Sequence, residues 1–182
     1  AETGRRILAA TQQLFLEAPM HEITLQGVAE RAGVALQTVL RRFGSRSGLI
    51  VAATSDATAR VSAQRDRAPV GDPAGAVENL FDHYEEWADV SLKILAEEPR
   101  SEEVAALARD GRALHVAWVE RVFAPQIRAR RGRARLELRC QLVAVCDVHV
   151  WKLLRRDQGL SRAAAEKAVL GIVQALCNQG VS

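Results

Sequence analysis

The stretch ITLQGVAERAGVALQTVLRRF, residues 23–43, predicts two short helices joined by a tight turn. Thr24 suits the N-cap of the first helix, because its hydroxyl can accept a hydrogen bond from an unpaired amide of the next turn. Gly33 suits the end of that helix, since a left-handed residue at this point costs little only for glycine. The second helix is expected over residues 36–43, so the stretch has the pattern of a helix-turn-helix.

The second helix of this pair is expected to present a polar face. Val39 and Phe43 point toward the first helix. The outward positions are Gln37, Thr38, Arg41 and Arg42, and none of them is acidic. Gln and Arg can make paired hydrogen bonds to adenine and guanine edges, and Thr can meet a base edge or a phosphate. We interpret this face as a DNA-reading surface, against the alternative of an ordinary exposed polar helix.

The flanking segments extend the pattern to a specific family frame. A helix is expected over residues 2–17, with Leu14 and Phe15 near its end. Phe43 is followed by Gly44, Ser45, Arg46 and Leu49. Over residues 4–50 the chain resembles, nearly position by position, the N-terminal DNA-binding domain of TetR-type transcriptional regulators. The resemblance implies an all-α fold, with a three-helix DNA-binding domain over residues 1–46 and a larger ligand-binding and dimerisation domain over residues 47–182.

The resemblance also implies the DNA contacts and shows where this chain departs from its family. The implied DNA-binding residues are Thr24, Gln26, Leu36, Gln37, Thr38, Leu40, Arg41, Arg42 and Arg46. Ala35 stands where a capping Ser is usual, and Leu40 where a phosphate-binding Tyr is usual. Arg42 replaces a common His, and Arg46 a common Lys. Gly48 stands where Glu often closes a capping box, so we expect a looser first turn in the helix of residues 45–65.

The remainder of the chain predicts helices and no strands. A long helix from residue 74 has an apolar stripe and an opposite acidic face that we interpret as solvated; the acids are Glu78, Asp82, Glu85 and Glu86. A helix over residues 101–130 has Gly111 in its packed stripe, where it leaves room for another backbone or a ligand. One helix over residues 136–154 is apolar on two sides. Together with a last helix containing Val169 and Ile172, it is expected to pair with a second copy as a homodimer.

Polar and aromatic residues on these apolar helices suggest a small-molecule cavity, because such groups orient a guest. The candidates for binding an effector are Tyr84, Trp87, Gly111, His115, Trp118, Asp147 and Trp151. His83 and His149 belong to the same group. The alternative is a core containing a few satisfied polar groups.

Composition limits the other classes of protein. The net charge of +3 and the pI of about 9.1 give only weak support for a nucleic-acid partner. Cys140, Cys146 and Cys177 lie in apolar stretches, and no signal peptide or membrane-spanning run is found, so a cytoplasmic location is expected. No side chains form a catalytic pattern, and Cys146 with His149 falls short of the four ligands of a zinc site. We expect no enzyme activity, no cofactor, no metal and no membrane partner.

The leading hypothesis is a TetR-like repressor that binds a palindromic double-stranded DNA operator as a dimer and is released by a small-molecule effector. The main alternative is a ligand-independent helix-turn-helix regulator controlled by a protein partner. A helical enzyme or metal-binding protein is the third possibility.

Overall fold

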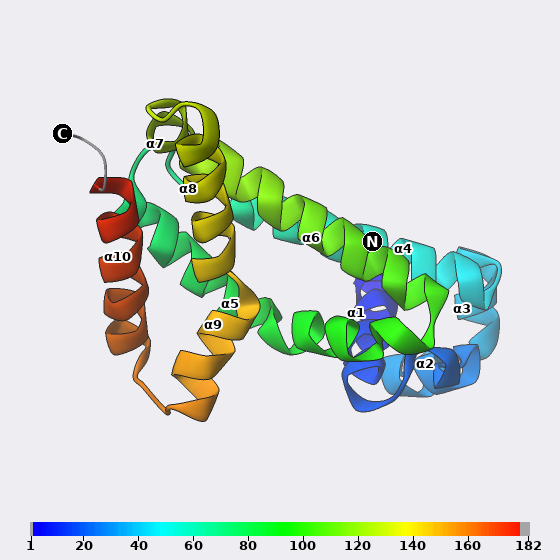
Figure 1. Ribbon diagram of the computed structural model, residues 1–182. Coiled ribbons are helices and arrows are strands. Elements are labelled where there is room, and N and C mark those ends of the chain that lie inside the picture. Colours follow the sequence, from blue (N-terminus) through cyan, green and yellow to red (C-terminus); the bar gives the residue numbers. More distant parts are fainter. Residues whose placement is uncertain (1, 179–182) are drawn as a thin grey trace. The chain divides into compact units, whose positions relative to one another are not determined.

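The structure, a computed structural model, describes residues 2–178, and every regular element within them is helical (Figure 1). The elements are α1 (Glu2–Glu17), η1 (Met20–Glu22), α2 (Leu25–Ala32), α3 (Leu36–Phe43), α4 (Arg46–Arg65), α5 (Pro73–Glu97), η2 (Glu98–Arg100), α6 (Glu102–Val122), α7 (Ala124–Arg128), α8 (Gly132–Val145), α9 (Val148–Lys152), the π-helical turn η3 (Leu153–Asp157) and α10 (Arg162–Asn178). The predicted all-α fold class is confirmed.

The chain forms two compact units, and the division between them falls after Val61, inside α4. The last turn of α4 therefore belongs to the second unit, although the helix begins directly after α3. The predicted functional boundary after residue 46 assigns all of α4 to the larger domain, and it stays a prediction.

The first unit is built on the small apolar core that α1, α2 and α3 share. Ile7, Val28 and Val39 are fully buried in it. On the buried face of α1, Ala10 also lies in the core, whereas Leu8 is only half-buried. Small residues on this face allow the short helices to pack closely.

The turn between α2 and α3 follows the sequence prediction. Thr24 Oγ1 accepts a hydrogen bond from Gly27 N at 3.0 Å, and Gly33 adopts a left-handed φ of 63°. A guanidinium from α1 adds a contact that periodicity does not reveal: Arg6 Nη2 donates to Ala32 O at 2.6 Å. This donor satisfies a carbonyl at the C-terminus of α2, where a cation is favoured by the helix dipole.

Gly48 corrects one sequence expectation. Ser45 Oγ accepts a hydrogen bond from Gly48 N at 3.0 Å, so the first turn of α4 is capped. A Cβ on Gly48, however, would collide with the carbonyl oxygen of Phe43 at the end of α3. The expectation of a loosened turn is wrong, because the missing side chain permits a close backbone approach between α3 and α4.

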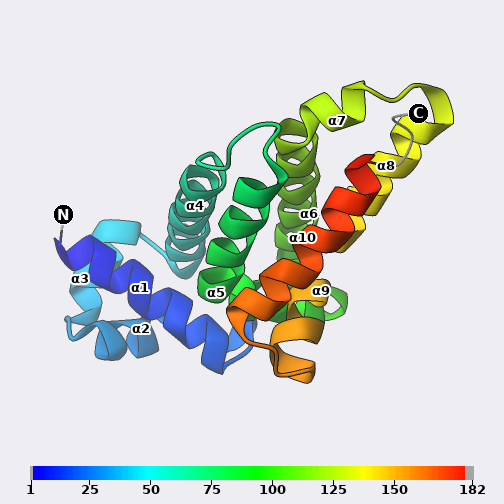
Figure 2. The same ribbon diagram turned by 90° about the vertical axis from the view of Figure 1, so that its left-hand side faces the viewer.

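The core of the second unit lies among α5, α6, α8 and α10. Phe81, Val119, Leu142 and Val173 have no exposed surface. Figure 2 shows α10 running along α8, and α10 also packs against α5. Among residues 2–178, no helix combines the length and the apolar character that a membrane span requires.

Two predicted helices of this unit have different bounds in the structure. The single helix expected over residues 136–154 is interrupted after Val145, because the Asp147 carboxylate caps α9 by accepting from His149 N at 2.9 Å. The helix expected over residues 101–130 ends at Val122, ahead of α7, which carries Pro125 in its first turn. In both cases a local capping or proline signal prevails over a continuous apolar pattern.

Replacing Gly48 by Ala tests the close approach of α3 and α4. Ala normally stabilises a helix interior by about 1 kcal/mol relative to Gly. Here the clash with Phe43 O should reverse the sign, and the free energy of unfolding should fall by about 1–3 kcal/mol, as in overpacked cores. Gly111→Ala is the matched control, because Gly111 lies in α6 with open space around it. Urea unfolding should show a gain for the control, and a gain in both variants would refute the close approach.

Candidate functional site

The outward face of α3 is the first candidate site. Gln37, Arg41 and Arg42 are exposed, Thr38 is partly exposed, and Leu36 retains 37% of its surface. Arg42 lies over Gly4 of α1, where any side chain would crowd its guanidinium. No ion pair within residues 2–178 occupies Arg41 or Arg42. The face therefore presents two unneutralised guanidiniums beside amide and hydroxyl groups.

The N-terminus of α3 lacks a side-chain cap, as the sequence predicts. Ala35 occupies the N-cap position, and the backbone compensates only in part, through a hydrogen bond of 2.9 Å from Thr38 N to Ala35 O. Leu40 is half-buried, so part of its side chain packs within the unit. The chain thus lacks both hydroxyl groups that its family frame would place here.

Two further predicted contacts, Thr24 and Gln26, lie exposed at the start of α2. The Thr24 hydroxyl caps the helix, and Gln26 Nε2 donates to Glu30 Oε1 at 2.7 Å. Both side chains therefore already have a local role. Gln26 would have to break its hydrogen bond with Glu30 before its side-chain amide could contact DNA.

Arg46 lies apart from the α3 face and makes structural contacts. Its Nε donates to Ile23 O at 2.7 Å, and its Nη2 donates to Met20 O. These carbonyls belong to the connection between α1 and α2, which the guanidinium closes. A phosphate contact by Arg46, expected from its place after Ser45, remains untested.

The candidate effector residues lie in the second unit, and the structure brings several of them together. Tyr84 Oη donates to Cys146 O at 2.9 Å, and His115 Nε2 lies 2.9 Å from Val143 O. The His115 and Trp118 rings stack with centroids 6.4 Å apart, and those of Tyr84 and Trp151 lie 6.2 Å apart. Tyr84, Trp87, Trp118 and Trp151 are buried, and His115 is half-buried.

Two candidates do not belong to this cluster in the way the sequence suggested. Gly111 is exposed, with open space where a side chain would be, so its predicted place in a packed stripe is wrong. Asp147 is half-buried, and its carboxylate accepts from both the amide and the ring Nδ1 of His149, the latter at 2.7 Å. Capping α9 is sufficient to explain this acid.

Sequence reasoning missed Arg65 and included His83 only as a member of a group. Arg65 is 8% exposed, and its guanidinium lies over the Trp118 ring at 4.6 Å and the Tyr84 ring at 5.4 Å. The signal was present in the sequence, because the inward positions of α4 recur every four residues and reach Arg65. We call Arg65, His83, Tyr84, His115 and Trp118 the polar core.

Burial dominates the ionisation of the polar core. It lowers the pKa of His83 to about 2, with Arg65 and His115 acting in the same direction. It also lowers the pKa of His115, against the hydrogen bond to Val143, and raises the pKa of Tyr84 above its usual range. Both histidines are therefore neutral at physiological pH. Within residues 2–178, no three His, Cys, Asp or Glu side chains are grouped as a metal site requires.

The acidic face of α5 is both exposed and paired. Glu85 accepts from Arg155 at 2.7 Å, and Asp82 accepts from Arg162 at 2.6 Å. Asp89, one turn further, pairs with Arg156 at 3.2 Å. All four acids of the predicted solvated face are exposed, which confirms that expectation. The ion pairs add contacts that join α5 to η3 and α10.

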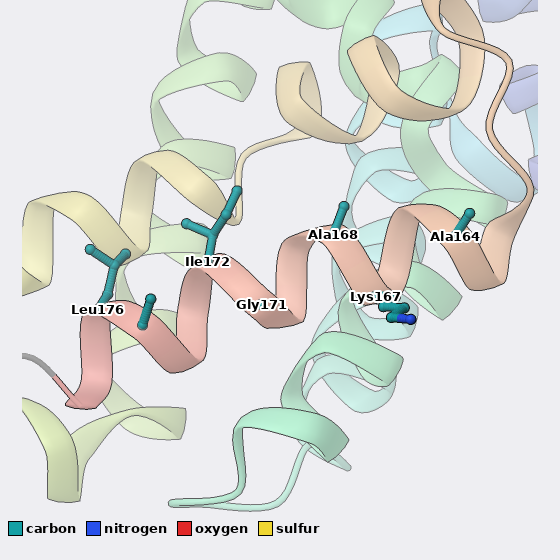
Figure 3. A pocket seen from close by; sticks show the side chains of 7 residues that line it. Ala164, Lys167, Ala168, Gly171, Ile172 and Leu176 are labelled. Atoms are coloured by element: carbon teal, nitrogen blue, oxygen red, sulfur yellow. The ribbon is translucent and has the colours of Figure 1, made fainter.

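The outward side of α10 forms an open groove of about 660 Å³ (Figure 3). Small and apolar residues recur along it every three or four positions; they are Ala164, Ala168, Gly171, Ile172, Ala175 and Leu176, with Lys167 the only charged one. Ile172 is 48% exposed, whereas Val169 on the inner side is 1% exposed. The two residues predicted to meet a partner thus lie on different sides of α10.

A comparison with protein families identifies the first unit. Residues 7–53 match the model described as bacterial regulatory proteins, tetR family. The first unit therefore has the DNA-binding domain of the TetR family. The matched segment runs from α1 into α4 and contains all of the predicted DNA-binding residues. Members of the TetR family are DNA-binding transcription factors and not enzymes, which agrees with the expectation for this chain.

The whole chain is similar in fold to solved structures of low sequence identity. A transcriptional regulator from Rhodococcus sp. Rha1 has a TM-score of 0.69 at 16% identity, with 95% of each chain covered. A protein assigned to the TetR family from Rhodococcus sp. has a TM-score of 0.65 at 19% identity, covering 98% of this chain and 100% of that one. A regulator from Pseudomonas aeruginosa PAO1 has a TM-score of 0.67 at 17% identity, covering 97% and 90%. No curated protein matches the chain in sequence.

The buried histidine of this protein should make its stability sensitive to acid. The pKa of His83 falls from 6.5 to about 2 on folding, so below about pH 6.5 only the unfolded chain takes up the proton. The free energy of unfolding should therefore fall by about 1.4 kcal/mol per pH unit as the pH decreases from about 6.5. Urea unfolding at about pH 7 and about pH 5 measures this slope.

His83→Gln should flatten that slope, whatever its effect on stability at neutral pH. His21→Gln is the matched control, because His21 is exposed in the first unit. Equal acid sensitivity of His83→Gln and wild type would show that His83 does not remain neutral in the folded protein.

Proposed function

We propose that this protein binds a palindromic DNA operator as a homodimer, acts as a repressor and is released by a small-molecule effector. The observation that carries the proposal is the outward face of α3, on which Gln37, Thr38, Arg41 and Arg42 are accessible. No carboxylate in the described part of the chain, residues 2–178, pairs with either arginine. A helix with such a face, held by a second helix at a fixed turn, is suited to the major groove. The amide and guanidinium groups would read base edges there.

The exposed apolar surface of α8 and α10 supports the dimer. Leu136 of α8 is 57% exposed and Ile172 of α10 is 48% exposed. Ala168, Gly171 and Ala175 would let the backbone of another helix approach α10 closely. A two-fold pairing through this surface would present two α3 helices to half-sites about 34–36 Å apart, or a multiple of that spacing.

The polar core supports control by an effector. His83 Nδ1, His115 Nδ1 and Trp118 Nε1 are buried without a hydrogen-bond partner, and an unsatisfied buried polar group costs about 1–3 kcal/mol. A guest that bonds to these groups would remove this cost. We assign the effector to the polar core together with Trp151, whose ring centroid lies 6.2 Å from that of Tyr84. Trp87, three residues after Tyr84 in α5, stays a candidate.

The coupling would operate through α4. A guest that favours one position of this helix must bind that conformation more tightly, and the same free energy then appears as altered DNA affinity. The alternative, control by a protein partner, would leave the polar core without a ligand. We also propose a cytoplasmic location, which suits the three cysteines, all of them free thiols.

Selection of duplexes from a random DNA pool tests the DNA-binding role and supplies the operator. Arg41→Ala should weaken binding to all sequences, and loss of a phosphate contact should flatten the salt dependence by about one unit of slope. Gln37→Ala should instead cost about 1–3 kcal/mol at one base pair and relax specificity there. Fluorescence anisotropy across a range of salt concentrations measures both effects.

Arg100→Ala is the matched control for Arg41→Ala, because Arg100 is an exposed arginine of the second unit. Its operator affinity and salt dependence should equal those of wild type. Unchanged operator affinity in both Arg41→Ala and Gln37→Ala would remove α3 as the DNA-reading helix.

Charge placed on the outer side of α10 tests the dimer. Ile172→Glu should yield a folded monomer, since the exposed position tolerates a carboxylate within one copy but not against a second. Gln174→Glu is the matched control, because Gln174 is exposed on α10 outside the groove. Val169→Glu should unfold the protein, since Val169 belongs to the core. A wild-type monomer in sedimentation equilibrium at micromolar concentration would exclude the dimer.

A further inference from the structure

Arg65 is a buried cation for which residues 2–178 provide no anionic partner. It lies in the last turn of α4, is 8% exposed, and its Nη1 is buried without a hydrogen-bond partner. Tyr84 and Trp118 offer the faces of their rings to the guanidinium, at 5.4 Å and 4.6 Å. Cation–π contacts offset only part of the cost of removing a charge from water.

The other arginines around α5 show that acids are plentiful but are placed elsewhere. Arg155, Arg156 and Arg162 pair with Glu85, Asp89 and Asp82, all on the outer face of α5. Within residues 2–178, no such pair includes Arg65. The Asp147 carboxylate acts electrostatically on Tyr84 and His115. It already accepts hydrogen bonds from the amide and the ring Nδ1 of His149.

The groups around Arg65 add hydrogen-bonding capacity without adding negative charge. Trp118 Nε1 can only donate, and it has no acceptor. His83 Nδ1 and His115 Nδ1 are also buried without partners, and burial together with the charge of Arg65 lowers the pKa of His83. The second unit therefore holds a positive, donor-bearing site between two aromatic rings.

We infer that the effector is a small organic carboxylate, whose carboxylate group pairs with the Arg65 guanidinium and whose apolar body lies against Tyr84 and Trp118. This inference rests on the proposed effector control and names the chemical class of the ligand. The planar fork of a guanidinium matches a carboxylate through two parallel hydrogen bonds. The aromatic rings favour an organic carboxylate with an apolar body over a small inorganic anion, which would match only the charge of the site.

The position of Arg65 explains how such a ligand would act on α4. Gln64 and Asn79 exchange two hydrogen bonds of 2.9 Å, each from a side-chain amide to the other residue's carbonyl. Arg121 Nη2 donates to Arg65 O at 2.8 Å. These contacts tie the end of α4 to α5 and α6. A carboxylate that attracts the Arg65 guanidinium would favour one position of the C-terminal end of α4.

The test uses the full-length protein with benzoate and decanoate as probes, each compared with its uncharged amide, benzamide or decanamide. Thermal unfolding and titration calorimetry at millimolar concentrations measure binding. At least one carboxylate should raise the melting temperature, whereas its amide should not. Equal binding of acid and amide, no response to either carboxylate, or a response to inorganic phosphate alone would each overturn the inference.

Variants of Arg65 show whether the response belongs to this site. Arg65→Met should weaken carboxylate binding roughly 10- to 100-fold, the effect of losing charge-assisted hydrogen bonds in a buried site. Its melting temperature without ligand should equal or exceed that of wild type, since an apolar side chain replaces an unpaired charge. Arg67→Met is the matched control, because Arg67 is exposed two residues away. Unchanged carboxylate binding in Arg65→Met would overturn the assignment.

Operator binding separates this inference from the proposed function. If the carboxylate binds wild type but not Arg65→Met, and wild type also binds its selected duplex, both the proposed function and the carboxylate inference are supported. If the duplex is bound and no carboxylate acts, the regulator stands and the inference fails. If no duplex is selected, the proposed function fails, while the carboxylate titrations still decide the role of Arg65.

Discussion

The fixing of α4 at both ends is the constraint on which the rest of the structure depends. At its start, Arg46 binds the Ile23 carbonyl and Gly48 lies against the backbone of Phe43. At its end, Gln64 exchanges two hydrogen bonds with Asn79. Bonds to backbone groups fix the rotation as well as the position of a helix. A helix fixed in this way can change its setting only when the contacts at one end change.

We place the proposed change at the polar core because its unpartnered polar groups lower the stability of the folded protein. The second unit pairs several of its surface charges, such as Glu85 with Arg155 and Asp82 with Arg162. It nevertheless leaves several buried polar atoms without partners around Arg65. Stability alone would favour an apolar side chain at that position. Groups that lower stability while serving a ligand are typical of functional sites. This cost is the physical basis on which we propose the polar core as the effector site.

Local sequence signals predicted the first unit well, and longer apolar patterns predicted the second unit less well. Thr24, Gly33 and Ser45 act on their immediate neighbours, so capping and turn chemistry could be read directly. The break before Asp147 was missed because apolar residues continue on both sides of it. Periodicity could not separate Val169 from Ile172, since a helix with a core side and a partner side is apolar on both. Arg65 was missed because an arginine is expected at the surface.

The departures of α3 from its family frame shift the balance of forces proposed for DNA binding. Ala35 supplies no side-chain cap and Leu40 no hydroxyl donor, so neutral hydrogen bonds to phosphate are fewer. Arg41 and Arg42 remain, and each guanidinium that meets a phosphate releases counterions. DNA affinity that comes from arginine–phosphate contacts depends more strongly on ionic strength than affinity that comes from neutral hydrogen-bond donors. In the proposed complex, discrimination among sequences would depend on Gln37 and Thr38, because hydrogen bonds to base edges release no counterions.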